Sequence, residues 1–165
     1  MAKIARKFMA HYINTTNGSG AAAYVLLGKN LEEYTAELSA EIEKHKNILG
    51  ENSIILSSYE KSGTVEPYYA EKGDTLFTRL QAIIDGSLVL DDCNTDIIEV
   101  KLWETPTAGA YPAIKENAVI EVSSYGGDNT GYQIPFNIHY TGEKTYGTFD
   151  PKTKAFTVAP ETPIK

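Results

Sequence analysis

Histidine and glutamate are the residue types in this chain that could perform general acid–base chemistry, because an imidazole titrates near neutral pH and a carboxylate can accept a proton. The three histidines are His11, His45 and His139. They lie far apart in the sequence, and neither a Gly-x-Ser-x-Gly elbow nor a His-Glu-x-x-His pair accompanies them. The sequence therefore disfavours a small enzyme that uses Glu41 and a histidine, and we predict a protein that is not an enzyme and has no catalytic residues.

A glycine-rich segment at residues 18–23 matches the G-x-G-x-x-A pattern of a dinucleotide-binding turn. That turn requires a helix directly after it, then a second strand with an acidic residue about 20 positions further on. Here the chain continues into residues 24–28, a short apolar run typical of a strand. The pattern favours a turn between two strands, and we predict no cofactor.

The side chains of Asp92, Asn94 and Asp96 have the spacing of the first three ligands of a calcium-binding loop. The similarity then ends, because Ile97 occupies the glycine position and Trp103 the position of the bidentate glutamate. Asp and Asn also bond their own backbone in turns. We therefore predict a capped turn before a strand, and no metal site.

The composition indicates a globular protein with an acidic surface. Of the 165 residues, 42% are hydrophobic and 22% charged, and the net charge is −7. A negative surface lacks the Lys and Arg clusters with which proteins bind phosphates tightly, so it would repel DNA. Cys93 is the only cysteine, which excludes a disulfide within the chain. We expect neither a signal peptide nor a membrane-spanning segment.

Residues 34–43 alternate between apolar and polar side chains without interruption, which is the period of a β-strand. A helix is the alternative, because Glu, Ala and Leu favour helices and the apolar residues also fit one helical stripe. We predict a strand. Only a strand places Glu37, Ser39 and Glu41 in one polar row on the face of a sheet.

A long hairpin loop is predicted at residues 44–52, because Gly50 interrupts the pattern before the next apolar run at residues 53–59. The loop carries two adjacent large apolar residues, Ile48 and Leu49. Such residues either fold back onto their own hairpin or contact a neighbouring molecule. The sequence leaves both possibilities open.

One helix is predicted at residues 74–85. Asp74 is a favourable N-cap, an apolar stripe extends over residues 76–84, and Gly86 stands at a position that often ends a helix. The helix is expected to cover one face of a sheet with this stripe. Arg79 falls on the opposite, solvated side.

The rest of the chain consists of alternating, strand-like segments separated by turn residues, which predicts antiparallel hairpins. The strands are expected at residues 98–103, 120–123 and 134–140, and the turns at residues 125–131, 141–144 and 150–153. We predict a mainly β fold with one α-helix, an antiparallel β-sandwich or barrel, in a single domain spanning residues 1–165.

Two groups of packing and turn motifs, one in the middle of the chain and one towards its C-terminus, resemble a known family. They are Lys46-Asn47-Ile48-Leu49-Gly50 through Val65-Glu66-Pro67-Tyr68-Tyr69-Ala70, Gly73-Asp74 and residues 80–84, then Phe136-Asn137-Ile138-His139-Tyr140 and Tyr146-Gly147-Thr148-Phe149-Asp150. The family is the major tail (tail tube) proteins of siphophages, bacteriophages with long, non-contractile tails. The motifs cover most of the chain beyond Leu31.

The resemblance implies a β-sandwich of the tail tube type with one flanking helix, six copies per ring, and stacked rings whose inner sheets form a channel for genome ejection. It implies that the hairpin loop reaches a neighbouring subunit or ring. The contact loop would be Lys46, Asn47, Ile48, Leu49 and Gly50. Acidic and small polar residues face the channel in such tubes, which implies this role for Glu37, Ser39 and Glu41.

The resemblance also implies the partners. They would be other copies of the chain, a tape measure protein inside the tube, and tail terminator and distal tail or baseplate proteins at its ends. Double-stranded DNA would pass without specific binding. The protein would belong to the virion and assemble in the bacterial host cytoplasm.

A β-sandwich module that binds carbohydrate or a cell-surface receptor is the alternative. The chain has eleven tyrosines and one tryptophan, Trp103, which could form a stacking platform for a sugar. Tyrosines are equally typical of subunit contacts and of β-strands in general. A binding module predicts a soluble monomer, whereas a tube subunit predicts rings or tubes.

Overall fold

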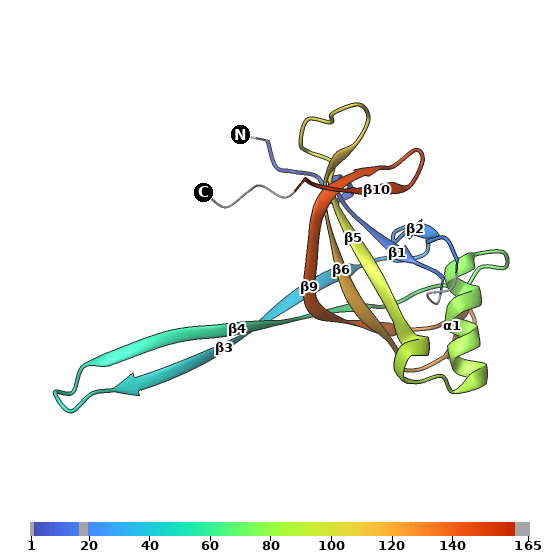
Figure 1. The fold of residues 1–165 in the computed structure, drawn as a ribbon. Coiled ribbons are helices and arrows are strands. Elements are labelled where there is room, and N and C mark those ends of the chain that lie inside the picture. Colours follow the sequence, from blue (N-terminus) through green and yellow to red (C-terminus); the bar gives the residue numbers. More distant parts are fainter. Residues whose placement is uncertain (1, 17–19, 161–165) are drawn as a thin grey trace.

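The computed structural model describes residues 2–16 and 20–160, which form ten β-strands, one α-helix and two short 3-10 helices (Figure 1). Residues 18 and 19 of the glycine-rich pattern lie outside the described residues. The strands are β1 (Met9–Asn14), β2 (Tyr24–Leu26), β3 (Tyr34–Lys46), β4 (Asn52–Val65), β5 (Asn94–Lys101), β6 (Tyr111–Val122), β7 (Gly126–Asp128), β8 (Gly131–Gln133), β9 (Phe136–Asp150) and β10 (Ala155–Val158). The helices are η1 (Arg6–Phe8), α1 (Thr75–Gly86) and η2 (Leu90–Cys93).

One antiparallel sheet contains eight of these strands in the order β2-β1-β5-β6-β9-β4-β3, with β10 paired to β9. Strand β9 holds the sheet together, because it pairs with β6 along most of its length, with β4 at its start and with β10 at its end. The sheet curls, α1 lies against it, and β3 and β4 extend far out on the other side (Figure 1). This confirms the predicted fold class, a mainly antiparallel β protein with one helix.

The core lies on both faces of the curled sheet. Neighbouring residues of a strand point to opposite faces, and Ile97 and Ile98 of β5 accordingly belong to two different buried clusters. The larger cluster includes Leu80 of α1, and the smaller one includes Phe149 near the end of β9. Burial of apolar surface on both faces stabilises this part of the molecule, which we call the body.

Helix α1 begins as the sequence predicts and ends differently. The carboxylate of Asp74 accepts a hydrogen bond from the backbone N–H of Leu76. Gly86 remains inside the helix, and Ser87 takes the left-handed cap conformation with φ of 47°, so the predicted glycine cap is wrong. The prediction of a solvated Arg79 is also wrong, because its guanidinium is buried and donates hydrogen bonds to the backbone carbonyls of Thr16, Asp92 and Asn94.

The turn predicted at residues 141–144 is wrong as well. Strand β9 continues through it, because β6 pairs with β9 on both sides of the segment, at Ala118–Tyr140 and at Glu116–Lys144. The extra residues form an irregularity in the ladder rather than the end of a strand. The turn predicted at residues 150–153 is confirmed, since it connects β9 to β10.

The hairpin of β3 and β4 settles the choice between strand and helix at residues 34–43. These residues are part of β3, which pairs with β4 over its whole length of 13 residues. The ladder continues to the Lys46–Asn52 pair, so the connecting loop is residues 47–51. The predicted loop of residues 44–52 was too long, because the cross-strand hydrogen bonds continue where the apolar pattern fades.

Candidate assembly surfaces

The residues considered for catalysis are not brought together. His11 is buried in β1, His45 stands near the end of β3, and His139 of β9 is exposed and paired with Glu121. The Glu41 carboxylate accepts a hydrogen bond from the Ser58 hydroxyl at 3.1 Å. Each of these side chains therefore has its own separate surroundings.

The calcium-like spacing does not produce a site either. The Asp96 carboxylate accepts hydrogen bonds from Asn14 and Tyr24, and Asn94 donates to Asp91. Within residues 2–16 and 20–160, no group of three or more His, Cys, Asp or Glu side chains could hold a metal ion. The search for membrane spans in the same residues found no helix with the length and apolar character needed to cross a bilayer.

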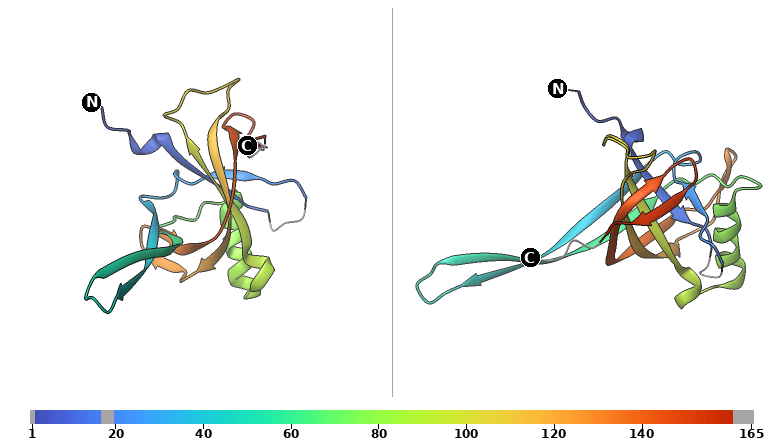
Figure 2. Two further views of the ribbon diagram at one scale, coloured as in Figure 1. Left: turned by 60° about the vertical axis from the view of Figure 1, so that its left-hand side comes forward. Right: turned by 45° about the horizontal axis from the view of Figure 1, so that its top comes forward.

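The most distinctive surface belongs to the hairpin. Strand β4 pairs with β9 only through residues 62–65, and beyond this point β3 and β4 have only each other. We call residues 37–61 the arm. Figure 2 shows in two further views that the arm projects away from the body. Nearly all of its side chains are exposed.

One face of the arm is apolar. Residues directly opposite in an antiparallel pair share a face, and the register places Leu38, Ala40 and Ile42 on the same face as residues of β4. The apolar residues of this face, which we call the apolar arm face, are Leu38, Ala40, Ile42, Ile54, Leu56 and Tyr59. Lys44, Lys46 and Lys61 lie on the same side of the hairpin at its two ends. The large members of the apolar arm face remain between 46% and 68% exposed. Such a row of exposed apolar side chains is typical of an interaction surface.

The other face is polar and acidic. It carries the three residues that the family resemblance assigns to the channel, with Glu37 opposite Ser62, Ser39 opposite Glu60 and Glu41 opposite Ser58. Nearer the tip, the exposed Ile55 stands opposite Glu43 on this same face. We call Glu37, Ser39, Glu41, Ser58 and Glu60 the polar arm face. A bulge at the next position, where the register skips a residue of β4 between Glu41 and Ile42, adds twist to the hairpin.

The arm ends in an ordered tip. The Asn47 side-chain oxygen accepts hydrogen bonds from the backbone N–H groups of Leu49 and Glu51, both at 3.0 Å, and the Asn47 amide donates to the Glu51 carboxylate. Gly50 has φ of 84°, a conformation that favours glycine. This turn presents Ile48 and Leu49 outward, 102% and 78% exposed. They therefore do not fold back onto the hairpin.

A buried ionic cluster lies at the root of the arm. The Lys61 ammonium contacts the carboxylates of Glu99 at 2.6 Å and Glu116 at 3.0 Å, and His11 lies 3.5 Å from Glu99. The ammonium also stands 4.3 Å from the centre of the Tyr140 ring. Burial alone would raise the pKa of Glu99, but hydrogen bonds from His11 and Lys61 outweigh burial and lower that pKa to about 2. The cluster ties β4 to strands β1, β5, β6 and β9 where the arm begins.

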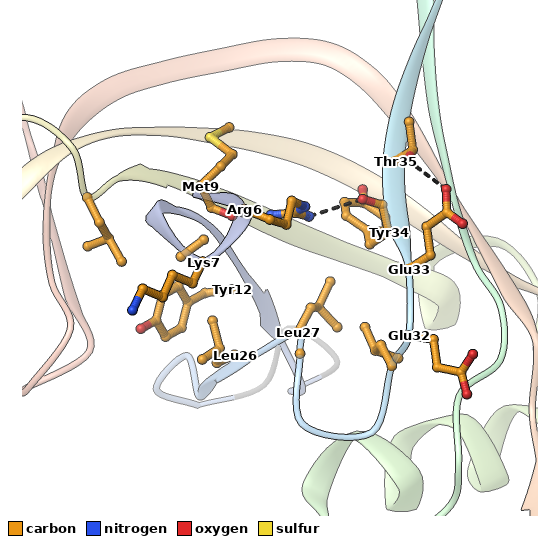
Figure 3. A pocket seen from close by; sticks show the side chains of 14 residues that line it. Arg6, Lys7, Met9, Tyr12, Leu26, Leu27, Glu32, Glu33, Tyr34 and Thr35 are labelled. Atoms are coloured by element: carbon orange, nitrogen blue, oxygen red, sulfur yellow. Dashed lines mark hydrogen bonds between the residues drawn. The ribbon is translucent and has the colours of Figure 1, made fainter. Parts of the chain in front are cut away.

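Among the grooves that indent the body, two have similar volumes of about 560 and 540 Å³. The first, about 560 Å³, lies between η1 and residues 26–35. Figure 3 shows its mixed lining, in which the apolar side chains of Leu26 and Leu27 occur together with the charged side chains of Arg6 and Glu32. Arg6 donates to the backbone carbonyl of Tyr34, so this groove adjoins the first residue of β3.

The second groove, about 540 Å³, lies between the C-terminal end of α1, η2 and the end of β6. Its rim has three exposed side chains, Val89, Leu90 and Tyr125, which are 64%, 83% and 63% exposed. Among the residues that line it, none is Lys or Arg. We call it the α1 groove.

Comparison with known proteins gives a match at the level of fold. The chain is similar to the SPP1 tail tube, whose structure combines solid-state NMR and cryo-electron microscopy, with a TM-score of 0.61. The similarity covers 86% of this chain and 78% of that chain at 18% sequence identity. No protein-family model and no curated protein sequence matches the chain. The fold is therefore that of a phage tail tube protein, as the sequence resemblance predicted.

Sequence reasoning missed the two features that define the arm. Ile54, Leu56 and Tyr59 of the apolar arm face belong to the apolar run at residues 53–59, whose composition does not show which face its side chains share with residues 38–42. Lys61 and Glu116 gave no signal, because their partners are 38 to 55 positions away. Four of the tyrosines cannot take part in a stacking platform for a sugar, because they are buried. They are Tyr12, Tyr24, Tyr34 and Tyr68.

Proposed function

We propose that this protein is the tail tube subunit of a siphophage, a structural virion protein that polymerises into the tube of the tail. The observation that carries the proposal is the arm, which exposes an apolar face and an apolar tip that its own chain does not cover. An exposed surface of this kind is unfavourable in a monomer and favourable in an assembly. The similarity in fold to the SPP1 tail tube supports the same function.

The proposed assembly consists of hexameric rings stacked around a channel. The outer edge of β3 leaves a row of backbone N–H and C=O groups unpaired, and such an edge is satisfied when a neighbouring copy adds a strand or closes a larger barrel. Repetition around a ring and along a stack makes weak contacts strong collectively. A tape measure protein would lie inside the tube, and terminator and distal tail or baseplate proteins would close its ends. Assembly would take place in the host cytoplasm.

Electron microscopy of the purified chain in negative stain tests the proposal directly. Rings or tubes are the expected result, because the subunit carries its own contact surfaces. Compact single particles at all concentrations would refute self-assembly and would favour the alternative, a carbohydrate- or receptor-binding module.

The contact loop of Lys46, Asn47, Ile48, Leu49 and Gly50 is proposed to reach a neighbouring subunit or ring. Replacing Ile48 and Leu49 together by Asp should stop polymerisation while leaving the monomer folded, because these side chains are exposed in the free subunit. Full-length tubes from this double variant would contradict the role of the loop. Circular dichroism of the variant supplies the folding control.

The polar arm face is proposed to line the channel at Glu37, Ser39 and Glu41. The row is acidic or small and polar, so it would repel the phosphates of passing DNA and avoid holding them. Reversing Glu37 and Glu41 to Lys should slow genome ejection. A phage that carries both changes and ejects its genome at an unchanged rate would contradict this assignment.

A further inference from the structure

We propose that the α1 groove binds the arm tip of a second copy of this chain. Each subunit would then contribute its tip to one contact and its α1 groove to another, so the contact could repeat along a stack. The proposal rests on the proposed self-assembly and adds to it the surface that the tip binds. Three observations carry it: the position of the groove, the match in polarity and the match in charge.

The position of the α1 groove, on the side of the subunit away from the arm, is compatible with a stack of subunits. Contacts that generate an open-ended array join two different surfaces of the same subunit, and these surfaces must lie on different sides of it. In Figure 1 the arm leaves the body on the side away from α1, and the two further views agree. Arm tip and α1 groove are therefore at opposite ends of the molecule, whereas the groove beside η1 adjoins the start of β3.

The polarity also matches. The tip presents Ile48 and Leu49 on a turn that is ordered by the Asn47 hydrogen bonds before any partner is bound, which lowers the entropic cost of docking. The α1 groove offers a largely aliphatic lining, including Ile84, Leu88 and Val119. Its volume of about 540 Å³ is in the range of sites that enclose a small ligand. Apolar anchors that fill a pocket at the centre of a contact typically supply most of its binding energy.

The charges are complementary. On the side of the hairpin that carries Ile54 and Leu56, Lys44 stands opposite Ile54 and Lys46 opposite Asn52, whereas Glu43 lies on the other side. Glu51 lies in the turn and accepts a hydrogen bond from Asn47. Four exposed acidic residues, by contrast, lie on the elements that form the α1 groove. Glu121 of β6 lines it, and Asp85 of α1 and Asp91 and Asp92 of η2 directly adjoin lining residues in the sequence. Opposite charge around an apolar contact fixes its orientation and speeds encounter.

Covalent capture tests the contact in the full chain. In a Cys93→Ala background, Leu49→Cys at the tip is combined with Val89→Cys at the rim of the α1 groove, and assembled protein is treated with a short bis-maleimide. A head-to-tail contact predicts a ladder of dimer, trimer and higher species on a denaturing gel. The matched control combines Leu49→Cys with Lys7→Cys, which lines the groove beside η1, and should give no ladder.

The outcomes separate this inference from the proposed function. Tubes that give a ladder only with the Lys7→Cys pair, or no ladder with either pair, would overturn the α1 groove as receptor and leave the tail tube function intact. Failure of the unmodified chain to form rings or tubes would overturn both.

A charge exchange provides a second test. Lys44→Glu with Lys46→Glu should raise the protein concentration needed for assembly by about tenfold, because it places like charges at the contact. Adding Asp91→Lys and Glu121→Lys should restore most of the loss. Lys152→Glu with Lys154→Glu makes the same change in net charge at the β9–β10 turn and should have little effect. The proposal would be overturned if the changes at Lys152 and Lys154 raised the concentration needed for assembly as much as those at Lys44 and Lys46. It would also be overturned if Asp91→Lys and Glu121→Lys did not lower that concentration again.

Discussion

The two ends of the β3–β4 hairpin have the same secondary structure and opposite surroundings. Near the body, Tyr34 and Val65 are buried and β4 pairs with β9. Towards the tip, the same two strands expose side chains such as Leu56 and Tyr59. The body therefore buries its own apolar side chains, whereas the arm leaves apolar side chains exposed. This difference supports the proposal that the arm serves assembly rather than the folding of the monomer.

The largest contrast is expected between a core residue and an arm residue. Replacing Phe136, which is fully buried, by Ala should lower the free energy of unfolding by about 3–5 kcal/mol. The matched change Tyr59→Ala in the arm should alter it by less than about 0.5 kcal/mol. Urea unfolding of the monomer, at concentrations below those of assembly, measures both. A comparable loss at Tyr59 would show that the arm is part of the folding unit.

The second prediction concerns the boundary between arm and body. Lys61→Met leaves the Glu99 and Glu116 carboxylates buried without their cation, which should destabilise the monomer by about 3 kcal/mol. Lys152→Met, at an exposed turn, serves as the control and should lie within about 0.5 kcal/mol of the parent protein. A Lys61→Met variant with an unchanged free energy of unfolding would mean that backbone pairing alone holds the root of the arm.

The same cluster predicts a dependence of stability on pH. Because folding lowers the pKa of Glu99 to about 2 from an ordinary value of 4.5, its ionised form stabilises the folded state above pH 4.5. This contribution is lost as the pH falls from 4.5 towards 2. Glu99→Gln should therefore show a smaller loss of stability in this window, by about 2 kcal/mol. Parallel pH profiles for the two proteins would contradict the role of Glu99.

The smallest of the four effects is expected at Gly63, where the arm meets the core. A Cβ atom at this position would lie 2.4 Å from the Tyr34 hydroxyl oxygen, and Tyr34 in turn shares a hydrogen bond with Tyr140. Gly63→Ala should cost about 1–2 kcal/mol, because the ring must move. Gly28→Ala is the control, since a Cβ there meets only Leu26 at 4.0 Å. Thermal unfolding of both variants decides the comparison.

Sequence reasoning was most successful where the signal is local. Alternation predicted the strand at residues 34–43, and the Asp74 cap with its apolar stripe predicted α1 within one residue at each end. It failed at Arg79 and at residues 141–144, where distant parts of the chain override the local pattern. Arg79 is buried because carbonyls near β1 and β5 accept its hydrogen bonds. Strand β9 continues past Gly142 because β6 pairs with it on both sides.

The strand periods, the helix cap and the two apolar residues of the tip can be read from short stretches of the chain, because neighbouring residues are enough to specify them. The negative charge follows from composition alone. Long-range pairing, by contrast, makes β3 and β4 extend beyond the sheet, brings Lys61 to Glu99 and Glu116, and puts the tip and the α1 groove at opposite ends of the molecule. Such features depend on which distant strands pair and where that pairing stops, and the alternation within one strand carries no information about either.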